Sequence, residues 1–166
     1  MNLTFENRGI IHMENARLVY RNFEGRGDKF NREGNRNFSV IIDTEEQADA
    51  LVNDVNEFGV GWNVKAKPPR DENEGPFLTL PVKVKFNDHG PAVWFRAGDN
   101  ADPVKLTEEE VTMLDRIDIA DVELFIRPYD DVISGKPFRA AYLQSICVTQ
   151  DLSRDPFAAR FARRGE

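Results

Sequence analysis

The sequence contains few of the residues that usually carry catalytic or metal chemistry. Of its 166 residues, one is cysteine, Cys147, and two are histidine, His12 and His89. A single cysteine excludes an internal disulfide, and its position in the apolar segment YLQSICV predicts a buried thiol. Two histidines so far apart do not have the spacing of a zinc site. We therefore expect no metal and no other cofactor.

Sequence motifs for catalysis are also missing. No serine or cysteine lies in a nucleophile-elbow pattern. The segment GRGDKFNREG has glycines and a lysine, but not at the spacing of a phosphate-binding P-loop. The carboxylates of Asp130–Asp131 and of residues 71–74 are of the type that holds magnesium in a nuclease, yet both lie in predicted turns, where acidic residues are common for solvation alone. We therefore expect a protein that is not an enzyme, with no catalytic residues.

Long apolar runs are absent too. None is long enough to span a bilayer, and the N-terminal segment MNLTFENRGIIH has no signal-peptide core. We therefore expect a cytoplasmic protein without a membrane partner. The length suits one domain with a real core, which we place at residues 1–150, followed by a C-terminal tail at 151–166.

The net charge of -7 is unevenly distributed along the chain. Residues 43–59 contain six acidic residues and no basic one, and residues 98–123 contain nine acidic and two basic residues. Both segments begin with a capping box, Thr44 with Gln47 and Thr107 with Glu110. We therefore predict two short helices with solvated acidic faces, and anionic ligands should avoid them.

The first of these helices should be the longest in the protein. Ala48, Leu51, Val52 and Val55 recur at helical spacing, and Gly59 offers a C-terminal cap. We predict that this helix runs from Thr44 to Glu57.

The rest of the chain is typical of β-strands, because β-branched and aromatic residues alternate with polar ones between turn residues. The predicted strands are 15–23, 36–42, 61–67, 77–86, 92–97, 121–129 and 138–150. In the strand 77–86, Leu78, Leu80, Val82, Val84 and Phe86 should share the core face. The fold class is therefore a mainly β, mostly antiparallel domain.

The strand 121–129 has an unusual second face. Period two directs Val122, Leu124 and Ile126 to the core, whereas Phe125, Arg127 and Tyr129 point the other way. A strand face that only contacts solvent does not need two aromatic rings beside an arginine, so this face calls for another explanation. In the strand 92–97, Trp94 and Arg96 repeat this pairing, and in the strand 77–86 the face opposite the core carries Lys83 and Lys85. The segment 25–42 also mixes basic and aromatic residues, and those that we single out are Arg26, Lys29, Phe30, Arg32 and Arg36.

Flat rings mixed with positive charge favour the binding of single-stranded nucleic acid, because bases stack on the rings and the cations follow the phosphates. The nucleic-acid-binding residues that we predict are these nine together with Phe125, Arg127 and Tyr129. Two alternatives stay open: a second layer or a dimer partner covers the aromatic face, or the loop GRGDKFNREGNR is a solvated hairpin tip with no ligand.

Several segments in order resemble a group of small bacteriophage-encoded proteins. They are RNFEGRGDKFNREGNRNFSVII, GWNVKAKPPRDENEGPFLTLPVKVKF, VELFIRPYD and GKPFRAAYLQSICVT. The resemblance implies an OB-fold-like, partly open barrel that binds single-stranded DNA during phage replication or recombination. Single-strand-binding proteins often end in an acidic tail, whereas this sequence ends ARFARRGE, which speaks against recruitment of partners by the tail.

The expected ligand is thus single-stranded DNA, bound with little sequence preference. Duplex DNA is a poor candidate because no predicted helix has a basic face. The alternative function is a protein–protein interaction or virion-associated structural module that uses the same aromatic face. The sequence leaves open a homo-oligomer, contacts with other replication or recombination proteins, and the choice between DNA and RNA.

Overall fold

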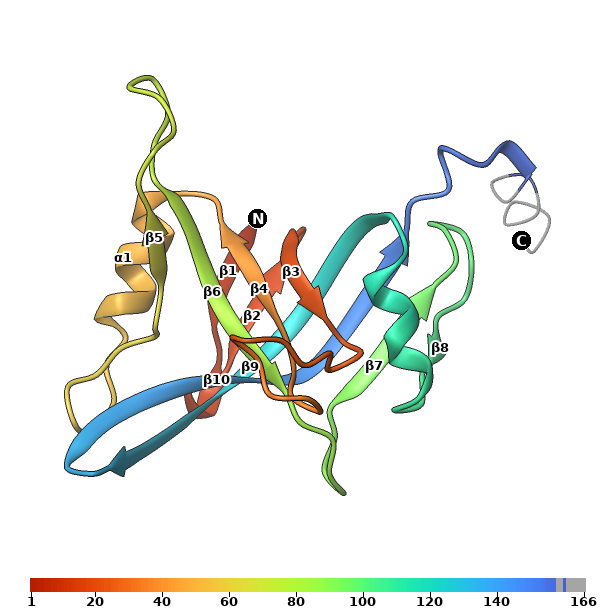
Figure 1. Ribbon diagram of the computed structural model, residues 1–166. Coiled ribbons are helices and arrows are strands. Elements are labelled where there is room, and N and C mark those ends of the chain that lie inside the picture. The colour runs from red at the N-terminus through yellow and green to blue at the C-terminus, as the bar shows by residue number, and fades with distance from the viewer. Residues whose placement is uncertain (158–159, 161–166) are drawn as a thin grey trace.

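The computed structural model describes residues 1–157 and 160, and Figure 1 shows its strands and helices in chain order. The strands are β1 (Asn2–Phe5), β2 (Ile11–Glu14), β3 (Leu18–Asn22), β4 (Arg36–Ile42), β5 (Lys65–Lys67), β6 (Phe77–Val84), β7 (Ala92–Arg96), β8 (Val104–Lys105), β9 (Ile119–Ile133) and β10 (Lys136–Gln150). The helices are α1 (Glu45–Asn53) and the short 3-10 helices η1 (Asn7–Gly9) and η2 (Glu110–Asp115).

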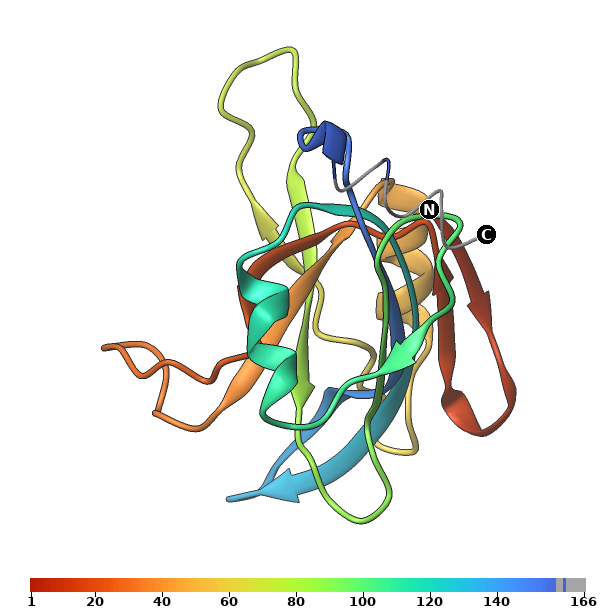
Figure 2. The same ribbon diagram turned by 90° about the vertical axis from the view of Figure 1, so that its right-hand side faces the viewer.

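The strands form one strongly curved sheet in the order β1-β2-β9-β10-β6-β4-β3. β5 adds to β6, and β7 adds to β10 and carries β8. The sheet curls round the core without closing, as the two views in Figures 1 and 2 show. The domain therefore has an open OB-like β fold, and the predicted fold class is confirmed.

The period-two pattern correctly identified the core faces of the central strands. Leu78, Leu80, Val82 and Val84 of β6 are buried, and so are Val122, Leu124 and Ile126 of β9. Phe86 lies past the end of β6 and is partly buried against the core. Burial of these alternating side chains fixes which face of each strand remains outside.

Helix α1 begins as predicted and ends four residues earlier. The Thr44 hydroxyl accepts a hydrogen bond from the backbone N–H of Gln47, so the capping box is confirmed. The helix stops at Asn53 because the chain turns back over its end, where the Trp62 N–H donates to the Leu51 carbonyl. Gly61 makes this return possible, since a Cβ there would lie 2.0 Å from the Val52 carbonyl oxygen. Of the predicted apolar stripe, Ala48 and Leu51 are buried, whereas Val52 and Val55 are exposed, and Asp54 rather than Gly59 caps the helix.

The second predicted helix is a 3-10 helix. Its capping box is present, because the Thr107 N–H donates to the Glu110 carboxylate and the Glu110 N–H donates to the Thr107 hydroxyl. Val111 and Leu114 are buried, as the apolar spacing implied. The helix η2 has six residues, Glu110–Asp115, and these include both buried side chains.

The strand predictions need correction at several positions. β1, β2 and β8 were missed, and only Lys65–Lys67 of the segment 61–67 is a strand. β9 and β10 are longer than predicted, because Ser134 and Gly135 both have positive φ and make a tight two-residue hairpin turn.

The predicted tail at 151–166 begins where β10 ends. Residues 158–159 and 161–166 of this tail lie outside the described residues, and the division of the chain at residue 150 stays a prediction. In the described part of the chain, no helix is long and apolar enough to cross a membrane.

A buried arginine joins the β9–β10 hairpin to the segment after α1. The Arg139 Nε atom lies 2.8 Å from Asp130 Oδ1, and Nη1 donates to the Asp54 carbonyl at 2.7 Å. The guanidinium lies over the Trp62 ring at 5.0 Å, and the Trp62 indole N–H donates to the Asp54 carboxylate. Asn56 donates a further hydrogen bond to Asp130. One cation therefore holds three separate segments together.

We expect the Arg139→Met variant to lose about 3 kcal/mol of unfolding free energy. The variant removes the Arg139 donors from Asp130 and from the Asp54 carbonyl, and Asp130 keeps only its bond from Asn56. Removing one partner of a buried ion pair costs about 3–5 kcal/mol, and the partial exposure of Asp130 reduces this cost. Urea denaturation measures this loss. The control is Lys136→Ala on the same hairpin, because Lys136 is exposed and its removal should cost little stability. An equal loss in both variants would contradict the proposed role of Arg139.

The same pair should contribute to acid sensitivity. The hydrogen bond from Arg139 lowers the pKa of Asp130 below its ordinary value of 3.8. Because the folded-state pKa is the lower one, this contribution to stability is complete above the ordinary pKa and is lost as the pH falls through the folded value. We expect Asp130→Asn to show a shallower fall in unfolding free energy between about pH 5 and pH 2 than the unmodified protein. Parallel denaturation curves with the same pH slope would count against this.

Candidate nucleic-acid interface

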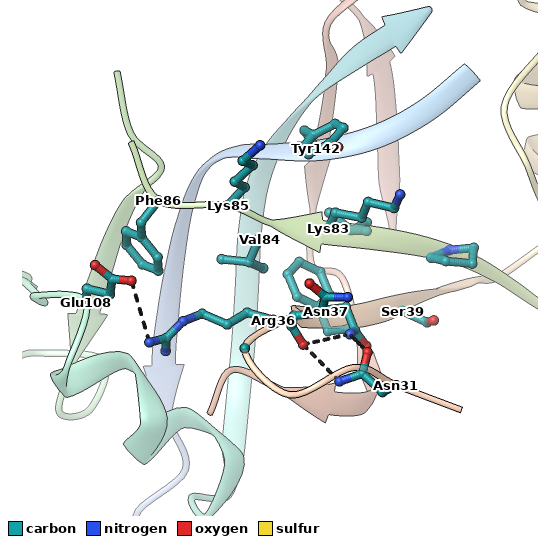
Figure 3. Close-up of a pocket in the computed structure, with 15 residues that line it drawn as sticks. Asn31, Arg36, Asn37, Ser39, Lys83, Val84, Lys85, Phe86, Glu108 and Tyr142 are labelled. Carbon is teal, nitrogen blue, oxygen red and sulfur yellow. Dashed lines mark hydrogen bonds and ion pairs between the residues drawn. The ribbon is translucent and has the colours of Figure 1, made fainter. Parts of the chain in front are cut away.

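The strand register aligns a row of aromatic and polar side chains across four strands. On the face opposite the core, Arg127 of β9 pairs with Tyr142 of β10, Tyr142 pairs with Lys83 of β6, and Lys83 pairs with Asn37 of β4. Figure 3 shows Tyr142, Lys83 and Lys85 near one another, on the far side of β6 from Arg36. The outward faces of distant segments thus form one continuous surface.

Tyr142 lies between two cations at the centre of this row. The Arg127 guanidinium carbon is 4.9 Å from the ring centroid and the Lys83 Nζ atom is 5.9 Å from it. Tyr129 meets the Tyr142 ring edge-on at 5.8 Å, and Phe138 lies 6.1 Å from Tyr129. We call Tyr129, Phe138 and Tyr142 the aromatic platform. Cations near an aromatic face are attracted by its quadrupole, so this arrangement brings positive charge and flat rings together.

The platform borders three adjoining hollows of the surface. One contains Lys83, Lys85, Asn37 and Tyr142 and is drawn in Figure 3. A second runs from Lys83 to Phe138, and a third joins Lys85 to Arg127. Among the described residues, none of these three cations forms an ion pair with a carboxylate. Their positive charge is therefore free to act on a ligand.

Tyr129 has a polar contact at the edge of the platform. Its hydroxyl donates to the Asp131 carboxylate at 3.0 Å, and this hydrogen bond together with the nearby negative charge raises the pKa of Tyr129. The side chain is 43% exposed, so one edge of the ring stays open to solvent.

Phe125 points outward as predicted but is already stacked on another ring. It pairs across strands with His12 of β2, and the two rings are stacked, with their centroids 4.2 Å apart and an angle of 4° between their planes. The His12 Nε2 atom lies 2.7 Å from a Glu123 carboxylate oxygen, and Glu6 lies 3.7 Å from Nδ1. One face of Phe125 is therefore covered, and its surroundings are acidic.

Trp94 and Arg96 lie farther along the same outward face. Trp94 of β7 pairs with Cys147 of β10, which in turn pairs with Glu123. Trp94 is 38% exposed, and Arg96 has a buried Nε atom without a hydrogen-bond partner in the described residues. Cys147, predicted to be buried, is half-buried, and this burial raises the pKa of its thiol. Neither Trp94 nor Arg96 joins the Tyr142 row.

The four basic and aromatic loop residues Arg26, Lys29, Phe30 and Arg32 lie between β3 and β4, in the predicted hairpin connection. Phe30 is 88% exposed, with the Lys29 Nζ atom 5.1 Å from its centroid. Arg36 behaves differently, because it stacks on Phe86 at 5.5 Å and pairs with Glu108 at 3.7 Å, as Figure 3 shows. Its guanidinium is engaged on the core side of β4.

Internal hydrogen bonds order this loop. The Asn31 amide donates to the carbonyls of Arg26, Arg32 and Asn35, and the Asp28 carboxylate accepts from the N–H groups of Phe30 and Asn31. At the base, the Asp115 carboxylate of η2 accepts from two consecutive N–H groups. The loop is therefore held beside the hollow that contains Lys83 and Tyr142.

Comparison with known proteins identifies the family. A family model described as a putative phage ssDNA-binding domain matches residues 4–164. This chain belongs to that family. No curated protein sequence matches this chain.

Solved structures support the same fold. The single-stranded DNA-binding protein from bacteriophage Enc34 in complex with ssDNA aligns with a TM-score of 0.57 and 14% identity, over 90% of this chain and 91% of that chain. Its C-terminal truncation aligns with a TM-score of 0.53 and 15% identity, over 90% and 91%. A third structure of the Enc34 protein gives 0.56 and 14%, over 90% and 86%. The resemblance seen in the sequence is thus confirmed.

Sequence reasoning missed Phe138 and Tyr142 of this phage ssDNA-binding domain. Both lie in the predicted strand 138–150, and in FRAAYL they alternate with Arg139 and Leu143, which are buried. That alternation was a usable signal. The alternation breaks after Leu143, where the register with β9 shifts. Over the whole strand, therefore, the sequence does not separate one apolar face from one polar face.

Release of the loop base should be measurable by proteolysis. We expect Asp115→Ala to raise the rate of tryptic cleavage after Arg26, Lys29 and Arg32, because the N–H groups of Phe23 and Glu24 lose their acceptor and local opening becomes easier. Mass spectrometry of the fragments locates the cuts. Asp118→Ala is the control, since Asp118 contacts the tail residue Arg154 instead. Equal cleavage rates in the two variants would show that Asp115 does not order the loop.

Proposed function

We propose that this domain binds single-stranded DNA without catalysis and with little sequence selectivity, through the aromatic platform and the cations Lys83, Lys85 and Arg127. One observation supports this most strongly: the half-buried Tyr142 ring lies between Arg127 and Lys83 in the outward-facing row of side chains. A base stacked on such a ring contributes about 1–3 kcal/mol, and any base has a suitable face. The flanking cations are placed for the phosphates on either side.

The platform suits unpaired bases better than a duplex. Stacking requires bases that are free of their own neighbours, which single strands supply. A helix that reads duplex DNA in the major groove lies close to the phosphates. Helix α1 has Glu45 and Glu46 in its first turn and no basic residue in its last turn, so its charge is unsuited to that role.

The charges around the aromatic platform favour one path for the DNA over the protein surface. Toward Phe125, a phosphate would meet Glu123 and Glu6, which surround His12. Toward β6 and β4 it would meet Lys83, Lys85 and then the basic loop. We therefore place the DNA across β10, β6 and β4, with Arg26, Lys29, Phe30 and Arg32 beside it and with Phe125, Trp94 and Arg96 outside the central contacts. Arg36 then acts indirectly, by holding the loop base through the Phe23 carbonyl.

Membership of a phage family suggests where this activity is used. Replication and recombination of a phage genome both generate displaced single strands in the host cytoplasm. A protein that coats them through stacking and phosphate contacts keeps the strands open and requires no cofactor. We propose this as the biological role.

Two substitutions separate stacking from charge. We expect Tyr142→Ala to weaken binding of a fluorescent oligothymidine by about 1–3 kcal/mol with little change in salt dependence. Lys83→Ala should instead reduce the slope of log affinity against log salt by about 0.7, the value for one phosphate contact on a single strand. Anisotropy titrations over a range of salt concentrations measure both.

The controls are Phe5→Ala, an exposed aromatic in the edge strand β1, and Lys136→Ala at the hairpin turn. Both should bind like the unmodified protein, and a duplex competitor should displace the oligonucleotide poorly. If the unmodified protein binds no single strand at low salt, the platform is instead an interface for another protein.

A further inference from the structure

Tyr20 has a backbone conformation that a bulky side chain rarely adopts. Its φ is +55°, and it lies where the register between β3 and β4 is interrupted, between Val19 and Asn22. Such left-handed positions suit glycine or asparagine, and a tyrosine there is a conformational outlier of the kind that clusters at functional sites. The ring is nonetheless 53% exposed, so burial in the core does not explain it.

The Tyr20 side chain meets a lysine from a strand that is not its neighbour. The Lys67 Nζ atom is 2.6 Å from the Tyr20 hydroxyl oxygen and 4.8 Å from the ring centroid. Lys67 belongs to β5 and Tyr20 to β3, and both β6 and β4 lie between these strands. The contact therefore crosses two strands.

The register shows which face of the sheet the contact crosses. Lys67 pairs with Phe77 of β6, and Phe77 and Lys83 are an even number of residues apart, so they point to the same side. On that side, Ser39 and Thr79 are only 8% and 6% exposed. If the long side chains of Lys67 and Tyr20 lie over Ser39 and Thr79, they explain why these two small polar residues are buried on an outward face.

This crossing adjoins the aromatic platform. The hollow that contains Tyr20 and Phe30 shares Asn31 and Asn37 with the hollow that contains Lys83 and Tyr142. A strand lying on Tyr142 and Lys83 and continuing past Asn37 therefore arrives at Tyr20. Three strand spacings of about 4.8 Å separate β10 from β3, so only an oligonucleotide of sufficient length reaches both rings.

We propose that Tyr20 and Lys67 form a second subsite for single-stranded DNA, in which an unpaired base stacks on Tyr20 and a phosphate binds Lys67. This rests on the proposed function. In the free protein the two side chains satisfy each other. On binding, Lys67 exchanges the Tyr20 hydroxyl for a phosphate oxygen, and a charge-assisted hydrogen bond to an anion is the stronger of the two. The ring then becomes available to the base.

Three variants of Tyr20 test this with oligothymidines of about 4 to 16 nucleotides, the range of site sizes on OB folds. Tyr20→Ala should weaken binding of the longest by about 5- to 150-fold, the range for one lost stacked base, and leave the shortest unchanged. Tyr20→Phe keeps the ring and loses only the hydrogen bond between its hydroxyl and Lys67, so its affinity should equal or exceed that of the unmodified protein.

Tyr20→Gly distinguishes a binding residue from a structural one. Glycine adopts positive φ without strain, so its melting temperature should be no lower than that of Tyr20→Ala, while its DNA affinity falls as in that variant. Phe58→Ala, which removes an aromatic ring of similar exposure beyond α1, is the control and should bind long oligonucleotides normally.

Two outcomes would overturn the second subsite. One is binding by Tyr20→Ala that matches the unmodified protein at every length; the other is a loss in Tyr20→Phe as large as that in Tyr20→Ala. In either case, loss of binding in Tyr142→Ala would leave the proposed function standing. If the unmodified protein binds no oligothymidine, the proposed function itself fails.

Discussion

The backbone hydrogen-bond ladder of β10 is the interaction on which the rest of this domain depends. One edge of β10 pairs with β9 along almost its whole length. The other edge is divided, because Tyr142 pairs with Lys83 of β6 while residues 145–149 pair with β7. The register irregularity between Leu143 and Ser145 lies where the partner changes. It keeps Leu143 and Ile146 both buried, although strict alternation would have placed one of them outside.

The position of Tyr142 follows from this divided edge. Tyr142 pairs with β9 on one side and with β6 on the other. The side chains beside it, Arg127 of β9 and Lys83 of β6, therefore come from two parts of the sheet that β10 alone connects. A protein with a net charge of -7 can in this way present a basic surface, because local potential depends on which side chains the register aligns and not on the total charge.

The sequence predicted what depends on local periodicity. The core faces of β6 and β9, the capping box at Thr44 and the hairpin connection before β4 all follow from spacing within one segment. Tyr142 was missed because the bulge breaks the period of β10, and Tyr20 because its left-handed conformation changes the direction that alternation would give it. Arg36 was included with the loop cations because the sequence does not reveal Phe86 and Glu108 as its partners, which come from distant segments.

The cations of this surface are already in place before any ligand arrives. Arg127 and Lys83 lie over Tyr142, and Lys67 lies over Tyr20, so each aromatic ring orders the charge that a phosphate would need. Ordering a long side chain on binding costs about 0.5–1.5 kcal/mol, and a surface ordered beforehand avoids part of this cost. In the proposed complex, a ring on which a base stacks would lose a cation contact, and that cation would gain a contact with a phosphate. Binding would then exchange one set of aromatic and ionic contacts for another, without requiring new order in the sheet that carries them.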